Sequence, residues 1–155
     1  MDMTRPMNEQ IVETLYHEAI DLAEYVRAVF AGGLDPADAD GGTSNPVRIA
    51  LSIEGMRATT RIMNVLAWLL NQRAFFNNEL SALQLLRRNK LTEDRPSDMA
   101  NLSVLEPETR ALIEETERLH ARVSRLDTEW REQEDGDGAP VQQLQDRIAT
   151  AFTAG

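Results

Sequence analysis

Histidine and cysteine, which often act in acid–base catalysis and metal binding, are scarce in this sequence. It contains two histidines, His17 and His120, and no cysteine, which excludes disulfides, thiolate metal sites and cysteine nucleophiles. Glu117 and His120 form one Glu-x-x-His pair, whereas a di-iron site in a helical bundle needs this pair on two helices. Carboxylate pairs such as Glu18 with Asp21 have the spacing of an ordinary solvated helix face. Glycine-rich phosphate loops, the nucleophile elbow and the zinc-protease motif are not found. We therefore expect a protein without enzymatic activity, cofactor or metal.

The most informative polar residues follow one another along the segment 57–73, at spacings that place most of them on one stripe of a helix. Arginine and tryptophan are the residue types most enriched at binding hot spots of protein interfaces. We therefore predict a protein-binding site formed by the following residues: Arg57, Arg61, Trp68, Gln72 and Arg73.

The same arginines have a structural interpretation, which the sequence leaves open. Arg61 or Arg73 can reach Glu18 or Asp21 on a neighbouring helix and fix the register of the two helices. A buried arginine is usually paired with a carboxylate, so this interpretation predicts a stabilising role instead of a contact with a partner.

The charge of the chain argues against nucleic acid as a partner. Its 155 residues include 16 basic and 26 acidic side chains, with a net charge of -10. Binding to phosphate backbones depends mainly on lysine and arginine, which displace counterions. The longest apolar run, from Ile62 to Leu70, is about half of what a helix needs to cross a bilayer, and the polar segment 1–10 does not resemble a secretory signal. We expect a cytoplasmic protein that binds neither nucleic acid nor membranes.

Three long segments have the apolar periodicity of helices. The first spans 8–31, and the second begins with the capping residue Asn45 followed by Pro46 in the first turn. The third begins at Pro107 and is expected to end near Glu134. Apolar residues recur every three or four positions at Ile11, Leu15, Ala19, Leu22, Val26 and Val29 in the first segment, and at Leu112, Leu119, Val123, Leu126 and Trp130, together with Thr116, in the third. Helices of about 35 to 45 Å, at 1.5 Å per residue, suit an antiparallel three-helix bundle.

The middle helix carries more apolar surface than three helices can easily cover. Its seam alternates steps of four and three, the period of helices that pack at shallow angles. The seam consists of Ile49, Ile53, Met56, Thr60, Met63, Ala67, Leu70 and Ala74. Leu66 and Leu69 form a second apolar stripe beside it, so the helix is apolar nearly all round and needs covering on every side. A second copy of the chain can supply that cover, and we predict a homodimer.

The remaining segments connect and extend these helices. We expect the middle helix to end near Phe76, before two asparagines, although an unbroken helix as far as Arg88 is an alternative. The segment 79–88 is expected to form a short amphipathic helix, 90–105 to be irregular, and 34–45 to be a flexible loop.

The C-terminal region is expected to be separate from the bundle. Asp135 to Pro140 contains two glycines and a proline, which predict a flexible acidic linker that interrupts any helix. Beyond it, Val141, Leu144, Ile148 and Phe152 recur at helical spacing, so the tail can form an amphipathic helix that either docks on the bundle or is presented to a partner. The predicted organisation is all-α: a three-helix bundle domain over 1–135, with a short additional helix, and a linker and tail over 136–155.

Two of these helices also resemble a known family. The first carries Leu15, Tyr16, Glu18, Ala19, Leu22, Ala23, Glu24 and Arg27, and the second carries Ser52, Glu54, Thr59, Thr60, Arg61, Met63 and the run Ala67-Trp68-Leu69-Leu70 followed by Gln72-Arg73-Ala74. Over roughly Ile11 to Leu126 the chain resembles the RcdA family, the regulator of CtrA degradation, which is also described as a bacterial domain of unknown function.

The resemblance implies a dimeric helical bundle that acts as an adaptor of the ClpXP protease. Such an adaptor docks on the primed unfoldase and tethers substrates, among them cell-cycle regulators, for regulated degradation. We therefore predict a non-enzymatic adaptor whose partners are ClpXP with its priming factor, the substrates, and a second copy of the chain. The alternatives are a homodimeric scaffold or regulator of another pathway, and a bundle that binds a small molecule among the methionines and tryptophan of the middle helix.

Overall fold

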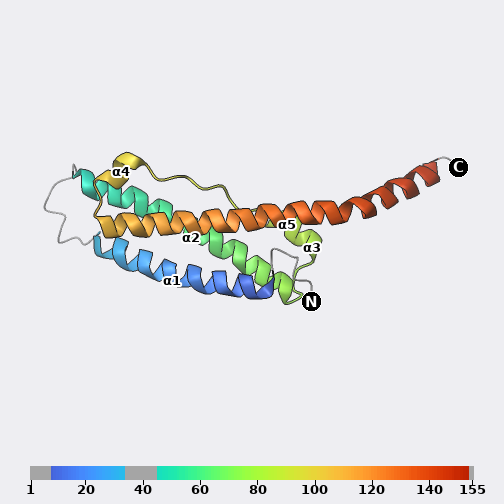
Figure 1. Ribbon diagram of the computed structural model, residues 1–155, viewed down its shortest axis with the longest axis horizontal. Helices are drawn as coiled ribbons and strands as arrows, with labels where there is room; N and C mark the ends of the chain where they lie inside the picture. The colour runs from blue at the N-terminus through green and yellow to red at the C-terminus, as the bar shows by residue number, and fades with distance from the viewer. Residues whose placement is uncertain (1–7, 34–44, 154–155) are drawn as a thin grey trace.

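The protein is an all-α bundle in which one helix extends far beyond the others (Figure 1). The computed structural model describes residues 8–33 and 45–153, and the side chains of all of these except 135–144 and 146. The described residues form α1 (Glu9–Gly33), α2 (Pro46–Phe76), α3 (Ala82–Arg88), α4 (Met99–Ser103) and α5 (Pro107–Thr153). The expected loop over 34–45 lies, except for Asn45, outside the described residues.

Local capping chemistry sets the beginnings of these helices. The backbone N–H of Ile11 donates to the Asn8 side chain at the start of α1, and the N–H of Val47 donates to the Asn45 side chain at the start of α2. Ser81 and Gln84 form a reciprocal capping box before α3. After Phe76 the chain turns at Asn78, which has a φ of 63°, so α2 ends where the sequence predicts and the unbroken helix to Arg88 does not form.

The helix faces of α1 and α5 enclose the core against α2. Trp68, Ile62 and Leu69 of α2 are fully buried between them. The core members contributed by the other two long helices include Val12, Leu15, Leu22, Val26 and Phe30 of α1, and Ile113, Leu119, Val123 and Trp130 of α5. The predicted faces of these two helices are largely confirmed, with Val12 and Phe30 taking the buried positions next to Ile11 and Val29.

The direction of α5 differs from the simple alternation that we expected. α1 runs antiparallel to α2, because Glu13 contacts Arg73 near one end and Phe30 contacts Gly55 near the other. α2 and α5, in contrast, run in the same direction (Figure 1). The reason is the connection over 89–98, named here the strap, which carries the chain back along the bundle before α5 begins. An extended segment of ten residues spans about 30 Å, enough for this return.

α5 continues through residues 135–140 to Thr153, so the helix break that we expected there is not present. Trp130 is the last buried residue in the described part of α5, and beyond it the helix leaves the bundle (Figure 1). The sequence there includes two glycines and Pro140, and a proline inside a helix lacks the backbone N–H that the helix would use for a hydrogen bond. A helix-interior proline costs about 3 kcal/mol and each glycine about 1 kcal/mol, so this part of α5 is intrinsically weak.

Candidate protein-binding surface

A stripe of apolar side chains on the outer side of α2 is the main candidate for a binding surface. Met56 is 66% exposed and Met63 is 59% exposed, while Ile49 and Leu70 are each about half exposed. The stripe, named here the α2 stripe, consists of Ile49, Ile53, Met56, Thr60, Met63, Ala67, Leu70 and Ala74. These are the residues of the predicted seam, but the bundle packs against the opposite side of α2 instead. That side combines large apolar residues such as Trp68 with small residues such as Gly55 and with buried polar residues such as Arg61.

The spacing of the α2 stripe is that of a helix–helix contact. Its steps alternate between four and three residues over 25 positions, or about 38 Å of helix at 1.5 Å per residue. Isolated exposed apolar residues are common on protein surfaces, whereas apolar residues at this regular spacing are typical of a helix face that another helix covers.

A groove runs beside the α2 stripe. It has a volume of about 460 Å³ and lies between α2 and the strap, with Met56, Arg57 and Thr60 on one wall and Glu93 and Arg95 on the other. Arg57 is one-third exposed and forms an ion pair of 2.9 Å with Glu54. Of the predicted binding residues, Arg57 and Arg61 line this groove, and Arg57 is the more exposed of the two.

Arg61 has a structural role, and its partners differ from those we expected. Its Nε donates to both carboxylate oxygens of Asp94 at 2.8 Å, where we expected Glu18 or Asp21. The remaining nitrogens donate to the Thr116 hydroxyl at 2.7 Å and to the Arg95 carbonyl at 3.0 Å. The side chain is buried, and every nitrogen of the guanidinium is used to hold the strap and α5 to α2.

Trp68 and Gln72 are also enclosed by the bundle. Trp68 is 2% exposed, and its Nε1 donates to Asp127 of α5 at 3.1 Å. Gln72 is buried, and its Nε2 has no hydrogen-bond partner within the described part of the chain. Arg61, Trp68 and Gln72 are therefore buried in the single chain, whereas we predicted them as part of a binding surface.

Arg73 joins α2 to α1 at the surface. Its Nε donates to Glu13 at 2.7 Å, and the guanidinium lies 4.2 Å from the centre of the Tyr16 ring. The hydrogen bond with Glu13 raises the pKa of Arg73 further above its usual value. The structural interpretation of this arginine thus has support, with Glu13 in place of Glu18 or Asp21.

The strap is held by buried polar side chains that sequence reasoning did not identify as a group. Asp127 accepts hydrogen bonds from Trp68 and from the backbone N–H of Leu91. His120 Nε2 lies 2.9 Å from the Thr92 carbonyl, and Asn89 donates to the Trp68 carbonyl at 3.1 Å. The sequence signal for this group was the occurrence of polar residues on otherwise apolar helix faces, such as Thr116, His120 and Asp127 on α5.

Glu54 anchors the far end of the strap. It is fully buried in α2, and its Oε1 accepts from the backbone N–H of Asp98 at 3.1 Å and from the Asn101 side chain at 3.0 Å. Burial alone would raise the pKa of Glu54, but these hydrogen bonds and the nearby Arg57 outweigh it and hold the pKa below its ordinary value. The short helix α4, which we expected to be irregular, begins at this anchor with Asp98 as its cap.

The described residues contain neither a metal-ligating cluster nor a membrane-spanning helix. No group of three or more histidine and carboxylate side chains in this part of the chain is arranged to hold a metal ion. Glu117 accepts a hydrogen bond from Ser97, and His120 contacts the strap. None of the described helices combines the length and apolar character that crossing a membrane requires.

The comparisons with known proteins identify the family of the chain. No curated protein and no solved structure is significantly similar to it. A family profile matches residues 3–152, which is nearly the whole chain. The protein therefore belongs to the family described as "Protein of unknown function (DUF1465)".

Proposed function

We propose that this protein is a non-enzymatic adaptor that binds other proteins and assists regulated proteolysis by ClpXP. The observation that carries the proposal is the α2 stripe, in which exposed large apolar side chains recur at every seventh position from Ile49 to Leu70. The resemblance of α1 and α2 to the RcdA family supplies the protease, its priming factor and cell-cycle regulators as the expected partners.

The design of the bundle supports a tethering role. An adaptor has to keep a stable body while offering surfaces to two partners, and it needs no reacting groups of its own. Here the buried polar groups are used to fix the strap, so they stabilise the body. The apolar side chains of the α2 stripe are not buried by the bundle. Their burial by a partner is favourable by about 25 cal/mol for each Å² of apolar surface.

Degradation of a candidate cell-cycle regulator by ClpXP in vitro tests this proposal, with the priming factor present and the protein either added or omitted. We expect faster degradation with the protein. The variants Met56→Glu and Met63→Glu should lose most of the stimulation, because a charged group in the α2 stripe opposes burial by a partner. Tyr25→Glu is the matched control, since Tyr25 is 66% exposed on α1, away from the stripe. Equal degradation rates with and without the protein would contradict the proposal.

A homodimeric scaffold of another pathway is the second candidate, and the regular spacing of the α2 stripe favours it. Two copies of the stripe can pack against each other about a two-fold axis, as self-complementary helix surfaces do. A pull-down from native cytosol that recovers stable partners, but neither the unfoldase nor its priming protein, would favour the scaffold over the adaptor.

A further inference from the structure

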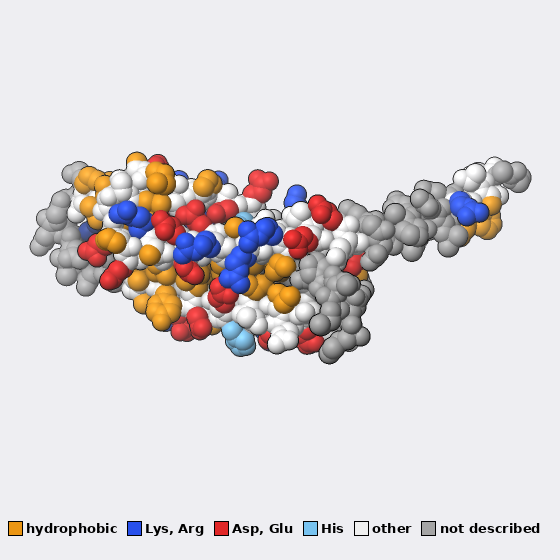
Figure 2. All heavy atoms as spheres, viewed as in Figure 1, with side chains coloured by type: hydrophobic (Ala, Val, Ile, Leu, Met, Phe, Trp, Pro, Cys, Tyr) orange, Lys and Arg blue, Asp and Glu red, His pale blue; other side chains and the backbone are white. Residues whose placement is uncertain are grey.

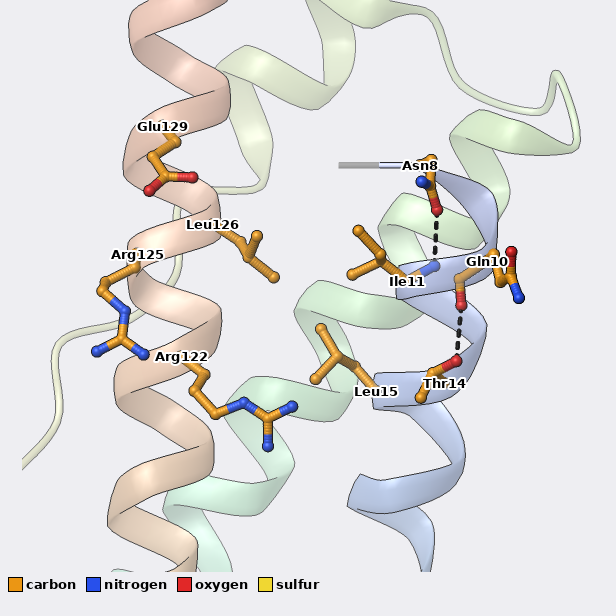
Figure 3. A pocket seen from close by; sticks show the side chains of 9 residues that line it. All are labelled: Asn8, Gln10, Ile11, Thr14, Leu15, Arg122, Arg125, Leu126 and Glu129. Atoms are coloured by element: carbon orange, nitrogen blue, oxygen red, sulfur yellow. Dashed lines mark hydrogen bonds between the residues drawn. The ribbon is translucent and has the colours of Figure 1, made fainter. Parts of the chain in front are cut away.

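A second groove lies on the other side of the molecule, between the beginning of α1 and the middle of α5 (Figure 3). It has a volume of about 480 Å³. Ile11 and Leu15 of α1 and Leu126 of α5 point into it and form an apolar floor, with α2 behind them (Figure 3). The space-filling view of this face shows hydrophobic side chains between the two helices, bordered by charged ones (Figure 2). The groove is thus suited to an apolar helix face.

The charged rim of this groove is only partly neutralised within the bundle. Arg122 forms an ion pair of 2.7 Å with Glu18. Arg125 and Glu129, one turn apart on α5, make no ion pair with any other described residue. An occupant that carries a charged group beside its apolar residues can therefore find a partner at the rim.

The end of α5 has the complementary features. Ile148 is 49% exposed and Phe152 is 85% exposed, and their spacing of four residues places them on one face of the helix. Arg147 lies beside them and forms no ion pair within the described part of the chain. Figure 2 shows these hydrophobic and basic groups at the projecting tip, with no other element next to them. This apolar face is thus held away from the bundle and packs against no other helix of the described residues.

Between the groove and this tip, α5 passes through its weakest residues. Gly136, Gly138 and Pro140 lie within five positions of one another. Each disfavours a helix interior, and the proline also prevents one backbone hydrogen bond. A turn over 135–140 has the usual length of a connection between two antiparallel helices.

We propose that the helix 141–153 folds back at residues 135–140 and seats its apolar face in the groove between α1 and α5. A hairpin centred on this turn brings Ile148 level with Asp127, next to Leu126, and Phe152 level with Val123, at the height of the groove. It also brings Arg147 level with Thr128, next to Glu129. The folded-back helix lies antiparallel to α5 and parallel to α1, and it completes a four-helix bundle at this end of the molecule.

We assign the groove to the helix 141–153 of the same chain, because the turn over 135–140 keeps this helix close to the groove. A short linker gives an effective concentration in the millimolar range, well above that of a second copy in solution. The α2 stripe lies on the other side of the bundle, so the closed tail leaves that surface free. The projecting and closed forms are then two states of one chain, and only the projecting form offers Ile148 and Phe152 to a partner.

Distance measurement between two spin labels tests the proposal. The chain contains no cysteine, so two introduced cysteines are the only sites that the labels can modify. Labels are placed at Thr14→Cys in the groove and Ala151→Cys on the tail. In the straight helix, residue 151 lies about 42 Å along the axis from residue 123, which is next to Arg122, and Arg122 lines the groove together with Thr14. The closed form brings the labels to within about 20 Å, by the diameter of adjacent helices.

The expected result is a short-distance population in the doubly labelled protein. Phe152→Asp should remove it, whereas Thr150→Asp, on the opposite face of the same helix, should keep it. Replacing Gly136, Gly138 and Pro140 together by alanine should shift the population to the long distance, because the helix then stays straight. A single population near 42 Å would overturn the proposal. So would a short distance that disappears on dilution with unlabelled protein, since that result assigns the groove to a second copy.

Discussion

At the scale of single residues, the polar groups of α2 serve the interior of the protein. Arg61 binds Asp94, Thr116 and the Arg95 carbonyl, and Trp68 binds Asp127. Residue types that are frequent at binding hot spots are also the types that can satisfy a buried network, because both uses require large side chains with directed hydrogen bonds. The sequence positions of these residues alone do not show whether they bind a partner or take part in a buried network.

Trp68→Ala should lower the free energy of unfolding by about 3 to 5 kcal/mol, the range for removing a large buried aromatic. Trp68 is 2% exposed and packs in the core, so the substitution leaves a cavity and also removes the hydrogen bond to Asp127. Urea unfolding followed by circular dichroism measures the change. Tyr25→Ala, on the exposed side of α1, is the control and should change stability by less than about 0.5 kcal/mol. Comparable stability of the two variants would show that Trp68 is not part of the core.

Glu54 should make stability depend on acid pH. Its pKa in the folded protein is below the ordinary value of 4.5, so the ionised carboxylate contributes its full stabilisation above that pH. The contribution is lost as the pH falls from about 4.5 through the lower pKa of the folded state. Glu54→Gln cannot titrate, so its free energy of unfolding should decrease less steeply than that of the original protein over this window. Urea unfolding at a series of pH values from 7 to 3 tests this, and parallel curves for the two proteins would exclude the assignment to Glu54.

At the scale of elements, helix beginnings and ends follow from local chemistry, whereas close approaches between helices do not. Asn45 with Pro46, and the two asparagines after Phe76, set the limits of α2 as expected. Gly55 lies on the side of α2 that faces α1, and a Cβ atom at this position would be 2.7 Å from Cδ1 of Phe30. The absence of a side chain at Gly55 thus allows the aromatic ring to pack directly on α2.

Gly55→Ala should destabilise the protein even though alanine favours helices. Overpacking in a core costs about 1 to 3 kcal/mol, against a gain of about 1 kcal/mol in helix propensity. Thermal unfolding of Gly55→Ala, Phe30→Leu and the double variant measures the coupling between the two positions. We expect the double variant to be more stable than the sum of the single changes predicts, because leucine leaves room for the added methyl group. Strict additivity would contradict a contact between these residues.

At the scale of the whole molecule, the direction of α5 decides which surfaces remain free. The strap returns the chain before α5 starts, so α2 and α5 run parallel and the strap covers part of the junction between them. With α1, α5 and the strap on its inner side, α2 keeps the α2 stripe on the outside. The stripe thus becomes available for contact with another protein, and a second copy of the chain is the first partner that we expect.

Met63→Glu should weaken self-association without lowering the stability of the monomer. Met63 is 59% exposed, so the charged side chain remains in water in the single chain but would be buried in a dimer formed through the α2 stripe. Sedimentation velocity at micromolar concentration compares this variant with the original protein and with Tyr25→Glu. A protein that sediments only as a monomer before any substitution would contradict the predicted homodimer.

The sequence by itself determined the all-α class, the positions of α1 and α2, the beginning of α5 and the short α3, because periodicity and capping act between residues a few positions apart. It also marked the seam that forms the α2 stripe, although it did not determine which way the seam faces. Only the tertiary structure decided that Arg61 binds Asp94, that Trp68 binds Asp127 and that α5 runs parallel to α2. These contacts join residues 33 to 59 positions apart, and their geometry depends on the path of the strap. The α2 stripe is exposed for the same reason: the polar groups on the opposite side of α2 need the buried partners that the strap and α5 provide.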